Sequence, residues 1–171
     1  MSKVPISRAP SQMSNGTKLF VRANEQWERR RLKSAFRLML AAAKSGDSGA
    51  QVDLGYFYDT GIGVKRNRKA ALYWYRRAAR RGEGAAAANI GTIFRDEKDM
   101  KRALSWFRRA AKMGNGDANL EMAKIYMQST DDLGMAIRYL RNTCKSRHVT
   151  EGTRDEAQTL LKQVISRPKA N

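Results

Sequence analysis

One pattern occurs three times in the chain, as NRKAALYWYRRAARRG at Asn67–Gly82, DMKRALSWFRRAAKMG at Asp99–Gly114 and DLGMAIRYLRNTCKSR at Asp132–Arg147. An earlier copy lies at Arg31–Gly46. Successive copies end 36, 32 and 33 residues apart, and a period of this size is typical of stacked helical hairpins. Apolar residues recur at helical spacing within each copy, so each copy is predicted to be the second helix of a hairpin.

The residues at both ends of the pattern predict where these helices begin and end. A short polar side chain, which can cap early backbone N–H groups, starts three copies: Asn67, Asp99 and Asp132. Glycine, which tolerates the left-handed backbone found after many helices, ends three copies: Gly46, Gly82 and Gly114. Cys144 stands where earlier copies have Ala79 and Ala111, so we expect its side chain to be buried.

A second alignment identifies the first helix of each hairpin. The matching sets are Ala50, Leu54, Gly55 and Tyr58, then Ala86, Ile90, Gly91 and Phe94, then Ala118, Met122, Ala123 and Tyr126. Glycine inside a helix costs roughly 1 kcal/mol relative to alanine, so its use at Gly55 and Gly91 requires compensation. We therefore expect a neighbouring helix to approach both glycines closely.

These residues resemble the Sel1-like repeat, a relative of the tetratricopeptide repeat. Its pattern is A-x-x-x-L-G-x-x-Y-x-x-G-x-G-V, a polar cap, and K-A-x-x-W-Y-x-x-A-A-x-x-G. The first full copy follows it at Ala50, Leu54, Gly55, Tyr58, Gly61, Gly63, Val64, Lys69, Ala70, Trp74, Tyr75, Ala78, Ala79 and Gly82. The second follows it at Gly91, Ala103, Trp106, Phe107, Ala110, Ala111 and Gly114, and the third is degenerate.

The resemblance implies an all-α fold, a right-handed α-solenoid of antiparallel helix pairs in which neighbouring hairpins stack into one core. The length favours one domain. The expected organisation is a mobile tail over 1–21, a solenoid over 22–165 and a frayed tail over 166–171. Within the solenoid we expect an opening helix at 24–46, repeats at 48–83, 84–115 and 116–147, and a capping helix at 153–164.

The composition excludes several kinds of protein. A single cysteine and a single histidine exclude a disulfide framework and a multi-histidine zinc site, so no metal or cofactor is expected. No apolar stretch is long enough to span a membrane, and no apolar segment opens the chain, so we expect a cytoplasmic protein. The glycines between Gly61 and Arg66 are interpreted as turn residues rather than a phosphate loop. No catalytic set is found, so no enzyme activity is expected.

The basic charge is the most informative feature for function. The chain has 34 basic and 16 acidic residues, a formal net charge of +18. Charges at helix ends and the need for solubility explain only part of this excess. The predicted basic face comprises Arg29, Arg30, Arg31, Arg76, Arg77, Arg80, Arg81, Arg108, Arg109 and Lys112. Its partner would be an acidic protein or, as the alternative, a nucleic acid; aromatic residues at core positions favour a protein.

The resemblance further implies that the first helices line a concave groove. Its predicted outward positions are Val52, Tyr56, Asp59, Ala88, Thr92, Arg95, Leu120, Lys124 and Met127. This mixed, partly apolar set is typical of a surface that binds a peptide or a helix. The hypothesis is therefore a monomeric protein–protein interaction module or adaptor that binds through the groove or the basic face. An enzyme-associated regulator of a cell-envelope process is a third hypothesis.

Overall fold

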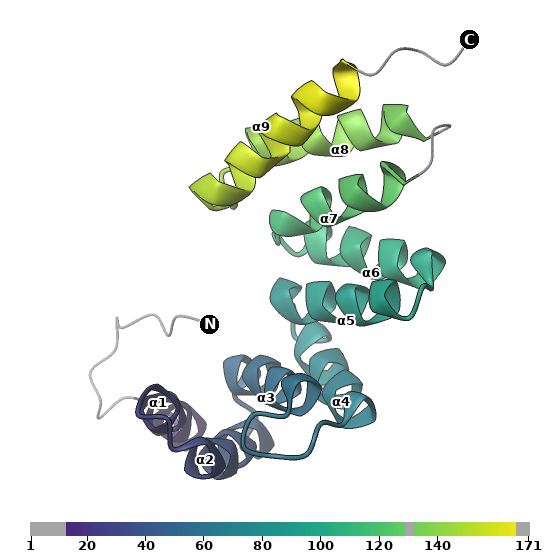
Figure 1. Cartoon of the computed structure of the whole chain (residues 1–171). Coiled ribbons are helices and arrows are strands. Elements are labelled where there is room, and N and C mark those ends of the chain that lie inside the picture. Colours follow the sequence, from purple (N-terminus) through teal and green to yellow (C-terminus); the bar gives the residue numbers. More distant parts are fainter. Residues whose placement is uncertain (1–12, 129–131, 167–171) are drawn as a thin grey trace. The chain divides into compact units, whose positions relative to one another are not determined.

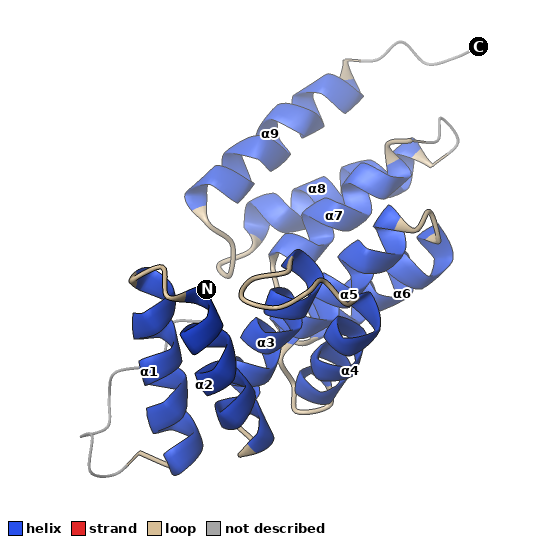
Figure 2. Cartoon of the chain, turned by 60° about the horizontal axis from the view of Figure 1, so that its bottom comes forward, coloured by secondary structure: helices blue, strands red, loops and turns tan. Residues whose placement is uncertain are grey.

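The computed structural model describes residues 13–128 and 132–166, and in these ranges every regular element is a helix (Figure 2). The predicted all-α class is confirmed for these residues. The chain divides into two compact units, of which unit 1 ends at Ala86 and unit 2 begins at Ala87. The length of the chain had favoured one domain. In repeat folds each hairpin contacts only its neighbours, so few contacts can join residues on the two sides of a boundary between repeats.

Unit 1 holds four helices, packed in sequence order (Figure 1). They are α1 (Asn15–Glu28), α2 (Leu32–Lys44), α3 (Ser48–Thr60) and α4 (Arg68–Ala79). Helix α1 packs on α2, α2 on α3 and α3 on α4. The shared core gathers apolar side chains from all four, including Phe20, Met39, Leu54, Phe57 and Trp74.

The first helix was missed by the sequence interpretation, and the expected tail over 1–21 is wrong from Asn15 onward. Ser14 caps α1, since its Oγ accepts a hydrogen bond from the Thr17 N–H at 3.1 Å. Phe20 then anchors the helix, because only 3% of its surface is exposed. Residues 1–12 lie outside the described ranges.

The expected single helix over 24–46 is also wrong, because the chain turns between α1 and α2. Arg30 adopts a φ of 58°, a left-handed conformation that interrupts a helix. The copy at Arg31–Gly46 thus supplies the second helix of a hairpin whose first helix is α1.

Close packing at the two helical glycines agrees with the sequence prediction. A Cβ atom at Gly55 would lie 2.5 Å from Cδ1 of Tyr75 on α4. A Cβ atom at Gly91 would lie 2.8 Å from Cδ1 of Phe107, the residue equivalent to Tyr75 in the next repeat. The α3–α4 and α5–α6 hairpins therefore each use an aromatic ring of the second helix to cover a glycine of the first.

Unit 2 contains most of α5 (Gly84–Asp96), which begins just before the unit boundary, and the helices that follow it. These are α6 (Met100–Lys112), α7 (Asp117–Tyr126), α8 (Leu133–Lys145) and α9 (Glu151–Ile165). Helix α6 packs on α7, α7 on α8 and α8 on α9 (Figure 1). Its core around α7–α9 includes Leu120, Ala123, Leu140, Ala157 and Val164. The predicted capping helix at 153–164 corresponds to α9.

Most predicted helix ends are confirmed. The Asn67 and Asp99 side chains accept hydrogen bonds from the backbone N–H groups of Ala70 and Arg102, at 3.0 and 2.8 Å. The glycines predicted to be left-handed have φ values of 91°, 92° and 84° at Gly46, Gly82 and Gly114. Asp132 is the exception, because its side chain makes no capping hydrogen bond to described residues of α8.

The expectation for Cys144 is wrong, because its side chain is only half-buried. Thr143, the preceding residue, is the fully buried one. Its hydroxyl can be buried because Oγ1 donates to the Tyr139 carbonyl oxygen at 3.1 Å. Thr143 corresponds to Ala78 in the alignment, so the buried stripe of α8 keeps the register of α4, and Cys144 is half-buried like Ala111 of α6.

Candidate protein-interaction surfaces

A cluster of basic side chains surrounds an exposed tyrosine on α4. Lys69, Tyr73, Arg76, Arg77 and Arg80 line a surface hollow of about 280 Å³, which we call the α4 basic patch. Tyr73 is 56% exposed, and its ring meets the edge of Trp74 at a centroid distance of 5.1 Å. The amphipathic helix produces this arrangement, because burial of Ala71, Trp74, Tyr75 and Ala78 turns the remaining side chains outward.

The cations of the α4 basic patch have no acidic partner in the part of the chain that the structure describes. Within the described residues, neither Lys69 nor Arg76, Arg77 or Arg80 forms an ion pair with a carboxylate. The Arg77 guanidinium instead lies 3.4 Å from the Tyr73 hydroxyl and 5.8 Å from the centre of the Trp74 ring. The patch therefore presents an uncompensated positive charge to solvent.

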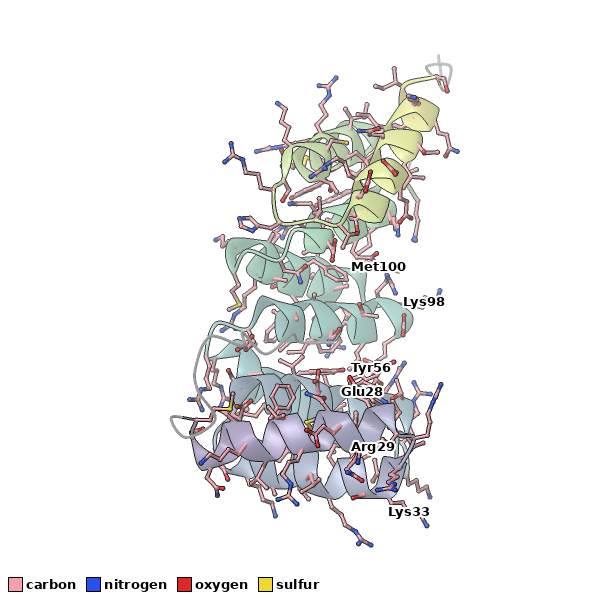
Figure 3. All side chains as sticks on the ribbon, turned by 90° about the vertical axis from the view of Figure 1, so that its left-hand side faces the viewer. Glu28, Arg29, Lys33, Tyr56, Lys98 and Met100 are labelled. Atoms are coloured by element: carbon pink, nitrogen blue, oxygen red, sulfur yellow. The ribbon has the colours of Figure 1, made fainter. Side chains whose placement is uncertain are left out.

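The remaining residues of the predicted basic face lie on other elements. Arg29, Arg30 and Arg31 are exposed at the turn between α1 and α2, where Figure 3 labels Arg29 beside Glu28. Arg81 is exposed just beyond the end of α4. Among the described residues, the members of the predicted basic face that line one surface hollow are therefore Arg76, Arg77 and Arg80.

The equivalent cations on α6 are partly engaged by aromatic neighbours. Arg108 donates from Nη2 to the Tyr126 hydroxyl at 3.1 Å, and the hydroxyls of Tyr126 and Tyr139 raise the pKa of Arg108. The two tyrosine rings stack with a centroid distance of 5.7 Å. Arg109 lies 5.1 Å from the centre of the Trp106 ring, while Lys112 is exposed. Arg109 therefore repeats the contact of Arg77 with Trp74, and α6 differs from α4 in the hydrogen bond that holds Arg108.

The groove residues predicted in unit 1 divide into three kinds. Tyr56 is 42% exposed and lies over the C-terminal end of α1, with its ring centre 6.1 Å from that of Trp27 (Figure 3). Val52 is only 4% exposed, so its assignment as an outward position is wrong. Asp59 is half-buried and faces Arg66 and Arg68 at 3.8 and 3.6 Å. Its charge is therefore balanced within unit 1.

The groove residues predicted in unit 2 are largely committed to internal contacts. Leu120 is 4% exposed and belongs to the core, so its outward assignment is wrong. Arg95 forms an ion pair with Glu121, and Lys124 pairs with Glu121 at 3.3 Å and Glu156 at 2.8 Å. Burial disfavours charged Lys124, but these carboxylates outweigh it and raise its pKa. The other predicted positions, Ala88, Thr92 and Met127, are half-buried.

Several of these residues escaped the sequence interpretation. Tyr73 carried a detectable signal, because it lies four residues from both Lys69 and Arg77 and so shares their helix face. Glu121 and Glu156 lie on different helices, and no local spacing relates them. Asp53 is only 6% exposed, and burial, with a smaller contribution from Asp47, raises its pKa to about 6. The position of Asp53 within a predicted helix does not indicate that its side chain is buried.

Metal and membrane sites are not found in the part of the chain that the structure describes. No group of histidine, cysteine or carboxylate side chains there could hold a metal ion. None of the helices there is long and apolar enough to cross a membrane. The loop at Gly61–Arg66 serves as a turn, with Gly63 packed against the carbonyl oxygen of Leu32.

The fold defines a helical-hairpin repeat protein of the α-solenoid class. The Sel1 repeat model matches residues 31–47, 48–83 and 85–115. The chain is therefore a Sel1-repeat protein. Proteins of this family are generally interaction modules that bind protein partners, and are generally not enzymes.

Solved structures share this fold. A Sel1 repeat protein from Oxalobacter formigenes has a TM-score of 0.74 and 22% identity, covering 91% of this chain and 65% of its own. A protective antigen of uropathogenic Escherichia coli strains with an SLR fold has a TM-score of 0.76 and 21% identity, covering 88% and 33%.

A curated relative matches a shorter segment. The chitin synthase regulator SKT5 of Saccharomyces cerevisiae is 49% identical over 45 residues, which cover 26% of this chain and 6% of SKT5. This chain thus spans less than two thirds of each of these three proteins.

Proposed function

We propose that this Sel1-repeat protein is an interaction module that binds an acidic partner protein through the α4 basic patch. The observation that carries the proposal is the group of cations around exposed Tyr73, none of which has a carboxylate partner among the described residues. Opposite charge on a partner would relieve their mutual repulsion and accelerate encounter. Tyr73 adds an amphipathic ring, a residue type enriched where protein interfaces bind most strongly.

The predicted groove is a weaker candidate for the acidic partner. Its two buried aliphatic residues, Val52 and Leu120, are not accessible to a ligand. Its cations Arg95 and Lys124 already pair with carboxylates, so binding an acidic segment there would require those pairs to break. The α4 basic patch requires no such exchange.

A nucleic acid is the second candidate partner, and exposed Tyr73 favours it. Proteins that bind single strands combine a basic surface with aromatic rings on which bases stack. The α4 basic patch offers one such ring. A nucleic-acid partner predicts that the logarithm of the binding constant falls with the logarithm of salt, with a slope near −0.9 per phosphate neutralised in duplex DNA.

Affinity capture with matched variants tests the proposal. The wild-type chain, Arg76→Glu/Arg80→Glu and the control Arg138→Glu/Arg141→Glu would be immobilised, with and without nuclease treatment of the extract. A direct acidic protein partner should survive nuclease, be lost with the α4 variant and be retained by the α8 control. Loss on nuclease treatment would favour the nucleic-acid alternative, and equal capture by both variants would contradict the α4 assignment.

A further inference from the structure

We propose that the α4 basic patch recognises a phosphorylated side chain of the partner protein. The inference rests on the proposed function and narrows its partner to a phosphate-bearing segment.

The lining residues of the patch form two neighbouring rows on the helix. Lys69, Tyr73 and Arg77 are four residues apart, and Arg76 and Arg80 form the second row. Residues four apart lie one above the other on a helix, so cations flank Tyr73 on both sides along the axis. Together they enclose the hollow of about 280 Å³, so one small anion can meet donors from more than one residue.

The stability of α4 does not explain this set. Arg76 and Arg77 lie in the last turn, where cations favour the helix dipole. Lys69 lies at the opposite end, in a first turn that contains no acidic residue. A cation there opposes the dipole, and like charges four residues apart repel. The cluster therefore carries an energetic cost that a ligand of opposite charge would offset.

The number of cations favours a phosphate over a carboxylate. A phosphorylated serine, threonine or tyrosine brings about −1.5 to −2 charge and three acceptor oxygens. A glutamate or aspartate brings a single charge and two oxygens. Arginine guanidinium groups bind phosphate through two parallel hydrogen bonds, and the patch offers three of them together with Lys69.

Helix α6 allows a comparison within the same chain, because it has cations at the same repeat positions as α4 but lacks the exposed tyrosine. Lys101, Arg108, Arg109 and Lys112 occupy the positions of Lys69, Arg76, Arg77 and Arg80, but Ser105 replaces Tyr73. Arg108 also donates a hydrogen bond to the Tyr126 hydroxyl, whereas the equivalent Arg76 forms no such bond among the described residues. Phosphate recognition is therefore assigned to α4 and not to every second helix of the repeat.

Calorimetric titration of the full chain with short peptides tests the inference. The probes are an acetylated Ala-Gly-X-Gly-Ala amide with X as phosphoserine, phosphotyrosine, serine or glutamate, and a twelve-nucleotide oligouridine. At about 50 mM salt, either phosphopeptide should bind about tenfold or more tightly than the glutamate peptide. Arg76→Gln/Arg80→Gln should remove this preference, and Tyr73→Ser should weaken it.

The α6 variant Arg109→Gln/Lys112→Gln, which loses the same net charge, should bind the phosphopeptides like the wild type. Equal binding of the phosphopeptides and the glutamate peptide through α4 would overturn the phosphate inference while leaving an acidic partner in place. Binding that survives in the α4 variant, or no binding of any acidic peptide, would overturn both. Tighter oligouridine binding through the same residues would identify the ligand as nucleic acid and also overturn the inference.

Discussion

The ring of Tyr75 covers Gly55 and leaves no room for a larger side chain there. Gly55→Leu should overpack this contact and lower the free energy of unfolding by roughly 1–3 kcal/mol. Gly134→Leu is the matched control, since Gly134 lies in α8 and an added Cβ would meet nothing within 4 Å. Urea titration followed by circular dichroism measures both. A change within about 0.5 kcal/mol at Gly55 would show that the Tyr75 ring can move aside.

The buried carboxyl group of Asp53 links stability to pH. Burial raises its pKa from 3.8 to about 6, so between these values the folded chain holds a proton that the unfolded chain releases. Its contribution to stability therefore falls as pH rises through this window, by up to about 3 kcal/mol. Asp53→Asn should remove this dependence and stabilise the chain at pH 7.5.

Thermal unfolding at pH 4.5 and 7.5 measures the difference between wild type and Asp53→Asn. Exposed Asp155→Asn should leave the pH dependence of the wild type unchanged. The difference, rather than the absolute curve, is informative because other carboxyls titrate oppositely; hydrogen bonds from Arg102, for example, lower the pKa of Asp99. A wild type that gains no stability over the variant at the lower pH would contradict the assigned burial effect.

At the scale of the helices, the ion pairs around Glu121 join α5, α7 and α9 within unit 2. Glu121 pairs with Arg95, and Lys124 connects it to Glu156. Because these side chains are partly exposed, we expect Glu121→Gln to cost only about 1 kcal/mol, and less at about 1 M salt. Denaturant unfolding at two salt concentrations measures this. An equal loss for Glu25→Gln on α1 would show that the effect is not specific to these pairs.

The helices themselves were largely predictable, because the repeated apolar spacing and the capping residues are local signals. Helix α1 was missed since its buried positions, Gly16, Phe20 and Ala23, are diluted by polar neighbours and two of them lack a large side chain. The residues of the surfaces were less predictable. Val52 and Leu120 were placed on the wrong side, because a position in a repeat does not determine what packs against it.

Contacts between side chains of different helices were even harder to predict from the sequence. The basic excess on the second helices was visible, but the contact that distinguishes them was not: Arg108 of α6 donates to the Tyr126 hydroxyl, whereas the equivalent Arg76 of α4 forms no such bond among the described residues. The partner residue lies 18 positions away along the chain. Only the three-dimensional contact distinguishes two helices of nearly equal charge.

For the whole molecule, the net charge of +18 raises the question of whether any polyanion would bind anywhere on the surface. Arg77→Glu/Arg81→Glu and Arg138→Glu/Arg141→Glu separate the two cases, because each pair of reversals removes the same amount of charge. Folding should be nearly intact in both, apart from the dipole interaction of roughly 0.3–1 kcal/mol that Arg77 loses in the last turn of α4. If the net charge of the whole surface attracts polyanions, both variants should lose the same affinity for poly-L-glutamate. If the binding site is local to α4, only the first variant should lose affinity.

We expect the local result, with a loss of about tenfold or more at about 50 mM salt that shrinks as salt screens the charges. Fluorescence anisotropy with labelled poly-L-glutamate measures it, and circular dichroism checks that both variants are folded. Unchanged binding in a well-folded α4 variant would move the interaction to another surface. Tyr56→Ala would then be the next variant, because that side chain is exposed beside Trp27 on the first helices.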